Sequence, residues 1–212
     1  ITLAAMFWGL SGGVASLLMD EGWDPYVISF YRGAIGLVCM LAWFVLHPLR
    51  NLRFDWRLIA WSVVAGVGVA GNFTFYFLSI SNANVAIAAT LMYTAPLFVF
   101  LVSFACGLEK PTLGKWASIT AVMVGIVLLT DILRSGTGQV SVWGIACGLL
   151  SGLSYALFIF GFRYARAQGP AQAVLTIAFL TLTLLLFAFV DVGQMQQVPF
   201  TDDAYGFLLL GL

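Results

Sequence analysis

The sequence predicts an all-α polytopic membrane protein, from its apolar composition, its long apolar runs and the uneven placement of its positive charges. Hydrophobic residues make up 62% of the 212 and charged residues 8%, and the mean hydropathy is +1.02. A soluble domain carries about 25% charged residues. A chain with so few charges cannot cover a water-exposed surface, so we expect the bilayer to be its solvent.

Seven apolar runs approach the length of about 20 residues that a helix needs to cross a bilayer. They cover residues 1–19, 25–46, 58–80, 84–106, 116–133, 142–164 and 171–190, and an eighth begins near Ala204. The chain starts at Ile1 and stops at Leu212 inside apolar runs. We therefore expect a truncated bundle of about seven complete transmembrane helices plus the start of an eighth.

Positive charge gathers in alternate connections between these runs. The second, fourth and sixth connections hold seven Lys and Arg residues, whereas the others hold only Arg134. The seven are Arg50, Arg53, Arg57, Lys110, Lys115, Arg163 and Arg166. Because cytoplasmic loops carry the excess of Lys and Arg, we predict an integral plasma-membrane protein, in the inner membrane of a bacterium, with a cytoplasmic N-terminal end.

Two segments of the chain share one plan of helix, short break and helix. Residues 3–46 and 145–190 align so that Pro25 falls opposite Pro170. Five helices separate the two starts, and because five is odd the second copy enters from the opposite face of the membrane. Such inverted repeats are typical of secondary transporters. The predicted domains are a first repeat of five helices (1–134) and a partial, inverted second repeat (142–212).

The middle of the chain carries a recognisable series of motifs. They are the run Phe77–Leu91, the sequence Tyr93-Thr94-Ala95-Pro96-Leu97, the turn Gly107–Thr112, Lys115-Trp116 and the run Gly125–Leu129. This series resembles the EamA-like branch of the drug/metabolite transporter superfamily, although Leu108 separates Gly107 from Glu109. The resemblance implies a ten-helix plan of 5+5 inverted repeats and export or exchange of small metabolites.

Arg32 is the charged residue that lies clearly inside a predicted span, about 10 Å along the helix from Pro25. An intramembrane Arg costs at least about 2.5–3.5 kcal/mol, so it should face the bundle interior and have a partner. As a substrate-binding group, it would neutralise a carboxylate or phosphate. Alternatively, it reaches outward to Asp20 or Asp24 and fixes the first two helices to each other.

Uncharged polar and aromatic residues recur on single helix faces, which should point inward because lipid offers them no partner. Together they predict a substrate cavity for an amphipathic metabolite, with interhelical hydrogen bonding as the alternative for each residue. Pro96 is a candidate gating hinge or a static kink. The candidate substrate-binding residues are Trp8, Ser11, Arg32, Asn72, Tyr76, Thr90, Tyr93, Ser151 and Tyr155.

Small residues repeat every four positions on two predicted helices, a spacing that permits close backbone approach. The two stripes are Gly144, Gly148 and Gly152, and Ala117, Ala121 and Gly125. Packing within the chain is the favoured interpretation, so we expect a monomer or a possible homodimer. The expected partners are a small-molecule substrate and membrane lipid. The zero net charge argues against nucleic acid.

These observations favour a secondary transporter that exports or exchanges amino acids, nucleosides or drugs by alternating access, and not an enzyme. We expect no cofactor, catalytic residue or metal site, since the three cysteines show no metal-ligand spacing. A lipid flippase of the same superfamily is the main alternative. An intramembrane serine hydrolase using Ser11 is a remote one, because the single histidine, His47, lies at the cytoplasmic end of the second span.

Overall fold

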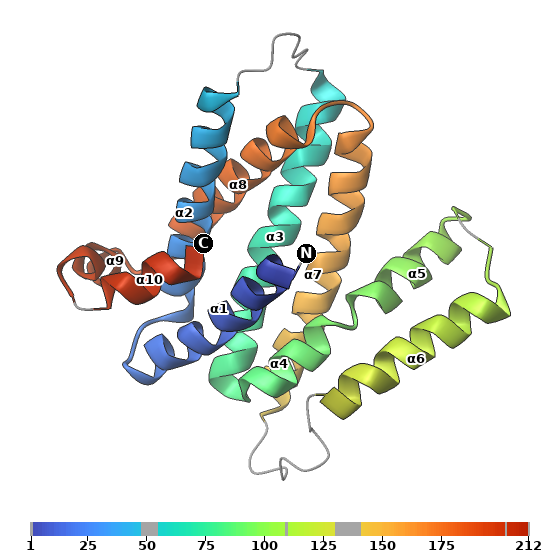
Figure 1. The fold of residues 1–212 in the computed structure, drawn as a ribbon, viewed down its shortest axis with the longest axis horizontal. Coiled ribbons are helices and arrows are strands. Elements are labelled where there is room, and N and C mark those ends of the chain that lie inside the picture. The colour runs from blue at the N-terminus through green and yellow to red at the C-terminus, as the bar shows by residue number, and fades with distance from the viewer. Residues whose placement is uncertain (1, 48–54, 109, 130–140, 202, 212) are drawn as a thin grey trace.

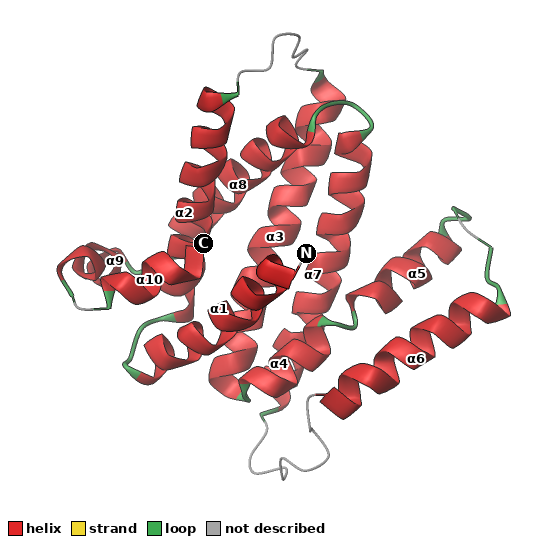
Figure 2. Ribbon diagram, in the orientation of Figure 1, coloured by secondary structure: helices red, strands yellow, loops and turns green. Residues whose placement is uncertain are grey.

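The computed structural model describes residues 2–47, 55–108, 110–129, 141–201 and 203–211, which form helices joined by turns and loops (Figures 1 and 2). In chain order, the helices are α1 (Thr2–Asp20), α2 (Pro25–Leu46), α3 (Trp56–Asn82), α4 (Val85–Met92), α5 (Ala95–Ala105), α6 (Leu113–Leu129), α7 (Val142–Arg166), α8 (Ala171–Phe187), α9 (Val192–Gln197), the short 3-10 helix η1 (Val198–Phe200) and α10 (Ala204–Gly211).

Polar side chains at the predicted breaks start several helices. Asp24 accepts a hydrogen bond from the Tyr26 amide (2.7 Å), and Asn84 accepts one from the Ile87 amide (2.8 Å). Each side chain satisfies an amide that the first helical turn leaves without a backbone partner. The short polar breaks in the sequence therefore act as helix caps.

Four segments are long and apolar enough to span a membrane: α2, α3, α4 together with α5, and α7. A fifth results if α8 is counted together with α9 and η1, which it meets at a bend of 113°. The chain is thus an all-α polytopic membrane protein, as predicted. The described spans that meet the length criterion number fewer than the expected seven, because the described part of α6 has 17 residues, α8 has 17, and the part of α1 whose side chains are described is Leu10–Asp20.

The fourth predicted span, α4 together with α5, is interrupted in the turn before Pro96, where a proline is expected to kink a helix. Helix α4 ends at Met92, and α5 begins at Ala95 with Pro96 in its first turn. The Thr94 hydroxyl donates to the Leu91 carbonyl at 2.6 Å and satisfies one of the acceptors at the end of α4. Pro is tolerated at the start of a helix because the missing amide has no partner there.

Helix α3 lies at the centre of the bundle, with α7 along its length and α8 across it (Figure 1). Leu58, Ala165 and Val174 form a buried cluster where α3 begins, α7 ends and α8 begins. The side chain of Gln172 donates to the carbonyls of Trp43 (2.7 Å) and His47 (3.3 Å), which joins the end of α2 to this cluster. The four helix ends therefore share one end of the bundle.

The basic residues Arg57, Arg163 and Arg166 are carried by these same helix ends, in agreement with the predicted sidedness. Residues 50, 53 and 134, which the charge argument also used, lie outside the described residues. At the opposite end, Asp20 closes α1 and Asp24 caps α2 (Figure 1).

The two small-residue stripes behave differently. A Cβ added to Gly152 would lie 2.8 Å from the Thr94 hydroxyl and 2.9 Å from the Leu91 carbonyl, so this stripe packs within the chain as expected. Ala117 and Ala121 are exposed, and a Cβ at Gly125 would meet none of the described residues within 4 Å. Packing within the chain stays a prediction for this second stripe, since none of the described helices covers it.

Candidate substrate-binding site

Arg32 is buried, with 9% of its surface exposed, and it faces the neighbouring helix α3. The guanidinium carbon lies 4.5 Å from the ring centroid of Phe73 and 5.8 Å from that of Phe77. These rings are four residues apart and form one aromatic face on α3. A cation over an aromatic face is stabilised by about 0.5–2 kcal/mol, which offsets part of the cost of a charge in lipid. Asp24, an alternative partner in the sequence analysis, caps α2 instead.

Three tyrosines from three different segments form a series that begins beside the Arg32 guanidinium. The Tyr76 phenol on α3 is buried and lies within electrostatic range of the Arg32 guanidinium. Tyr93 lies in the break between α4 and α5 and is 42% exposed. It lies within electrostatic range of both Tyr76 and the half-buried Tyr155 of α7. The structure therefore brings four of the predicted site residues together.

The broken helix contributes to this group because it ends beside the tyrosines. Tyr93 is the C-terminal cap of α4, and Thr94 precedes the first residue of α5. Interrupted helices in membrane proteins provide backbone polar groups at the depth where substrates bind. Gly152 of α7 packs directly against the break, which keeps α7 close to it.

Asn72 and Ser151 are also predicted site residues, but they bind each other. The Asn72 side-chain amide donates to the Ser151 hydroxyl (3.0 Å) and carbonyl (3.2 Å), and the Ser151 hydroxyl donates to the Asn72 carbonyl (3.2 Å). Both residues are almost completely buried between α3 and α7. Thr90 likewise donates to the Ala86 carbonyl of its own helix (2.7 Å). These contacts correspond to the interhelical and structural alternative.

The remaining predicted residues occupy separate positions. Ser11 is buried on α1, and the adjacent Gly12 approaches the Tyr76 hydroxyl, which a Cβ at Gly12 would meet at 2.9 Å. Trp8 lies on α1, but its side chain is outside the described residues. Pro96 is exposed and lines a different pocket. His47 follows the last residue of α2, at the end of the bundle where Gln172 donates to its carbonyl.

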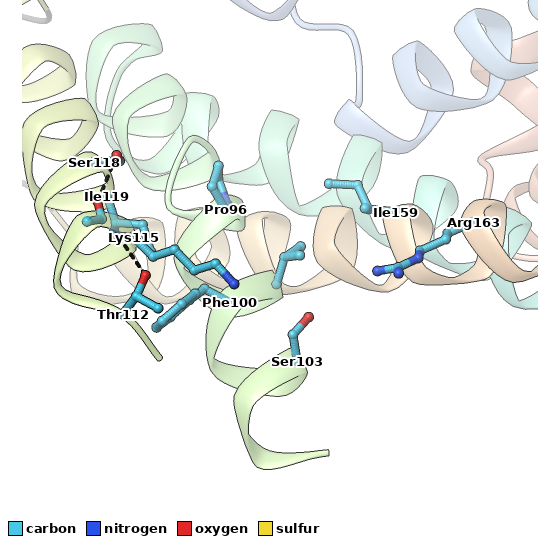
Figure 3. A pocket seen from close by; sticks show the side chains of 11 residues that line it. Pro96, Phe100, Ser103, Thr112, Lys115, Ser118, Ile119, Ile159 and Arg163 are labelled. Carbon is cyan, nitrogen blue, oxygen red and sulfur yellow. Dashed lines mark hydrogen bonds between the residues drawn. The ribbon is translucent and has the colours of Figure 1, made fainter. Parts of the chain in front are cut away.

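Sequence reasoning missed the partners of these residues. Phe73 and Phe77 are apolar residues in an apolar helix, and only their four-residue spacing beside Asn72 and Tyr76 marks them as a possible cation-binding face. It also missed a pocket of about 640 Å³ between α5, α6 and α7, which Figure 3 shows. Lys115 and Arg163 line this pocket, and the sequence analysis used both only as indicators of sidedness.

Comparison with solved structures shows the fold. One crystal structure superposes on 95% of this chain and 72% of its own, with a TM-score of 0.61 and 20% sequence identity.

Comparison with curated sequences finds transporters. An uncharacterized transporter of Helicobacter pylori is 26% identical over 220 residues, covering 100% of this chain and 72% of that protein. The threonine/homoserine exporter RhtA of Escherichia coli is 29% identical over 170 residues, or 80% of this chain and 52% of RhtA. The model of the EamA-like transporter family matches residues 1–131. Since this match covers more than half of the chain, the protein is a membrane transporter that belongs to the EamA-like transporter family.

Proposed function

We propose that the protein is a secondary transporter that exports or exchanges a small carboxylate-bearing metabolite, such as an amino acid, by alternating access. The observation that carries this proposal is the buried Arg32, which faces the bundle interior beside Tyr76. The name of the E. coli relative, a threonine/homoserine exporter, supports the same substrate class.

In this proposal, Arg32 supplies the positive charge for the substrate carboxylate. A guanidinium binds a carboxylate through two parallel hydrogen bonds, and a buried site strengthens that interaction. The three tyrosines, Tyr76, Tyr93 and Tyr155, contact the remainder of the substrate through ring faces and hydroxyls. Tyr93 is the most exposed of the three and is the group that an entering substrate meets first.

The packing of the helices supports two inverted halves. Helix α3 packs on α7 and α8, while α10 packs on α1 and α2. The expected counterparts in the two repeats are α1 and α7, α2 and α8, and α3 and α10. When each helix is replaced by its counterpart, the α3–α7 contact becomes α10–α1 and the α3–α8 contact becomes α10–α2. Although the α2–α3 and α1–α3 contacts have no comparable counterpart among the described residues, the α2–α8 contact maps onto itself and the α1–α2 contact maps onto α7–α8. This is the pattern expected if residues 1–134 and 142–212 belong to oppositely inserted repeats that rock around a central site.

The same arrangement supports a cytoplasmic N-terminal end. Helix α1 runs toward the end of the bundle where Asp20 and Asp24 lie, away from the end that carries Arg57, Arg163 and Arg166 (Figure 1). Because basic loops face the cytoplasm, the start of α1 lies on the cytoplasmic side.

The test of Arg32 is an export assay with carboxylate and amide forms of one substrate. Cells loaded with threonine or with threonine amide are compared for efflux with the protein and with its Arg32→Gln variant. A hydrogen bond to a charged group contributes about 1.5–3 kcal/mol, so Arg32→Gln should lower the efflux rate constant for threonine by about 10- to 100-fold. The amide, which lacks the carboxylate, should be exported slowly by both proteins.

The matched control is Arg166→Gln, which removes an exposed cation from the basic end of α7. It should leave threonine efflux within about twofold of the unsubstituted protein, since surface charges contribute little. The ratio of the efflux rate constants for threonine and threonine amide is compared between the unsubstituted protein and Arg32→Gln. If folded Arg32→Gln had the same ratio as the unsubstituted protein, Arg32 would not belong to the substrate site. Size-exclusion chromatography of each variant separates this outcome from misfolding.

A further inference from the structure

A second site lies away from Arg32, in the pocket of about 640 Å³ between α5, α6 and α7. Its volume is within the range of about 300–1,000 Å³ found for pockets that hold small ligands. At the basic end, its lining includes Lys115 of α6 and Arg163 of α7. The two side chains extend toward each other across the pocket in Figure 3. The Lys115 ammonium also donates to the Lys110 carbonyl at 3.4 Å, which holds it at this end of the pocket.

The lining changes from polar to apolar along the direction of the helices. On α5, Ser103 lies near the basic end, and Val99 lies one turn deeper. On α7, Ile159 lies one turn deeper than Arg163, and on α6, Ile119 lies one turn deeper than Lys115. Three helices therefore present hydroxyls and cations at one end and aliphatic side chains below them.

A smaller pocket of about 170 Å³ continues the apolar part. It shares Pro96, Ser118 and Ile119 with the larger pocket and is completed by Leu97 and Met123. The combined space has a cationic end at the depth of the helix termini and an apolar end at the depth of the hydrocarbon core. This is the polarity profile of a phospholipid, whose headgroup phosphate and acyl chain occupy those two depths.

The position of the pocket favours a lipid over a water-soluble anion. Helix α6 lies at the edge of the bundle (Figure 1), and Trp116 and Val124 on this helix are exposed. An apolar surface that the chain does not cover faces lipid in a membrane protein. Basic pockets between transmembrane helices on the cytoplasmic side are suited to anionic headgroups.

We propose that this pocket binds one anionic phospholipid, with its headgroup phosphate between Lys115 and Arg163. One acyl chain passes Val99 and Ile159 and ends beside Met123. The lipid lies between α6 and α7 and contacts both helices.

Native mass spectrometry of the purified full-length protein tests this proposal. The protein is mixed in detergent with dioleoyl phosphatidylglycerol or dioleoyl phosphatidylcholine, and the dissociation constant of the first bound lipid is measured. Each cation near an anionic headgroup contributes about 1 kcal/mol, so the Lys115→Gln/Arg163→Gln variant should bind phosphatidylglycerol about 25-fold more weakly. Binding of phosphatidylcholine should change little. The matched control is Arg57→Gln, an exposed cation at the same end of the bundle that does not line the pocket.

A second variant tests the apolar end without changing charge. Ile119→Trp fills the space shared by the two pockets and should weaken phosphatidylglycerol binding while both cations remain. If Lys115→Gln/Arg163→Gln is not monodisperse, Ile119→Trp is the variant that tests the proposal. Unchanged phosphatidylglycerol binding in folded Ile119→Trp, or an equal loss in Arg57→Gln, would overturn the proposal.

Glycerol phosphate, which has the charged group without chains, distinguishes a lipid from a free anion. At millimolar concentration it should displace little phosphatidylglycerol. If glycerol phosphate displaced all of the phosphatidylglycerol at a concentration equal to that of the lipid, the pocket would be a site for free anions, and the proposal would be contradicted. Loss of substrate efflux in Lys115→Gln/Arg163→Gln with unchanged lipid binding would assign the pocket to the substrate route instead. The Arg32 experiment does not depend on any of these outcomes.

Discussion

The α3–α7 interface and the α6 face are built from similar sequences but pack very differently. Each contains a stripe of small residues every four positions, Gly144 to Gly152 on α7 and Ala117 to Gly125 on α6. On α7 the stripe is buried against α3, α4 and the α4–α5 break. On α6 it is exposed, and the neighbouring space is a pocket.

Polar contacts account for part of the difference. The α7 stripe is accompanied by the Asn72–Ser151 pair and by the Ser79 hydroxyl, which donates to the Gly144 carbonyl (2.8 Å). On α6, by contrast, Ser118 donates to the Gly114 carbonyl of its own helix (2.9 Å). Small residues permit close approach, and side chains that bond across the interface determine which helix approaches.

The largest expected effect comes from the same substitution in the two stripes. Gly152→Leu places a side chain where the Thr94 hydroxyl and the Leu91 carbonyl lie within 3 Å of the new Cβ. Overpacking against backbone costs about 1–3 kcal/mol or more, so this variant should lose most of its monodisperse fraction and melt at a lower temperature. Gly125→Leu enters open space and should be neutral or slightly stabilising, since Leu has the higher helix propensity.

Thermal unfolding in detergent, followed by intrinsic fluorescence, measures both variants. If Gly125→Leu were as damaging as Gly152→Leu, the α6 stripe would have a partner in the assembled protein. A homodimer through α6 would then be the first possibility to examine, by crosslinking in membranes.

A smaller effect is expected from the Asn72–Ser151 pair. Interhelical hydrogen bonds in membrane proteins contribute about 0.6 kcal/mol on average and about 1.7 kcal/mol at most. Asn72→Ala and Ser151→Ala should each destabilise the protein. In a double-mutant cycle, the coupling free energy should lie in that range. A coupling near zero would mean that close glycine packing alone holds α3 to α7, whereas lost transport at unchanged stability would restore the pair to the substrate site.

The sequence was sufficient for features that depend on composition and local pattern. Apolar runs located most helix boundaries, and the expense of a charge in lipid predicted that Arg32 faces inward. The family resemblance stated from the motifs is confirmed by the family match. These features follow from the solvent and from the nearest residues in the chain.

Features that depend on which helices become neighbours were not predictable in the same way. The polar face of Asn72 and Tyr76 was correctly identified, but periodicity cannot say that Asn72 meets Ser151 while Tyr76 lies near Arg32. The break lies in the turn before Pro96, where the missing amide and the ring of proline interrupt a helix, but its contact with Gly152 of a distant segment was not predictable. Lys115 and Arg163 are 48 positions apart in the sequence, and only the arrangement of α6 and α7 places them on one pocket.

The smallest expected effect concerns a contact in water at the end of the bundle opposite the basic residues. Trp23 donates from its indole nitrogen to Asp203 at 2.8 Å, and Glu21 also hydrogen-bonds to Asp203. The hydrogen bond to Asp203, together with the repulsion between the two carboxylates, raises the pKa of Glu21 above its ordinary value. This contact joins the α1–α2 turn to the start of α10, without the close packing of the α3–α7 interface.

The sign of the pH dependence follows from the raised pKa. Protonated Glu21 donates to Asp203, so this contribution to stability is fully present below the ordinary carboxyl pKa and is lost as the pH rises through the raised value. Thermal stability should therefore fall slightly as the pH rises above the ordinary carboxyl pKa of about 4.3 and through the raised pKa of Glu21, and less at high salt, because both groups are near solvent. Glu21→Gln keeps a hydrogen-bond donor without a charge and should remove this part of the pH dependence. If Glu21→Gln retained the full pH dependence, other carboxylates would cause it, and the contact of α10 with α1 and α2 would depend on Trp23 and on the buried cluster that includes Leu18 and Phe207.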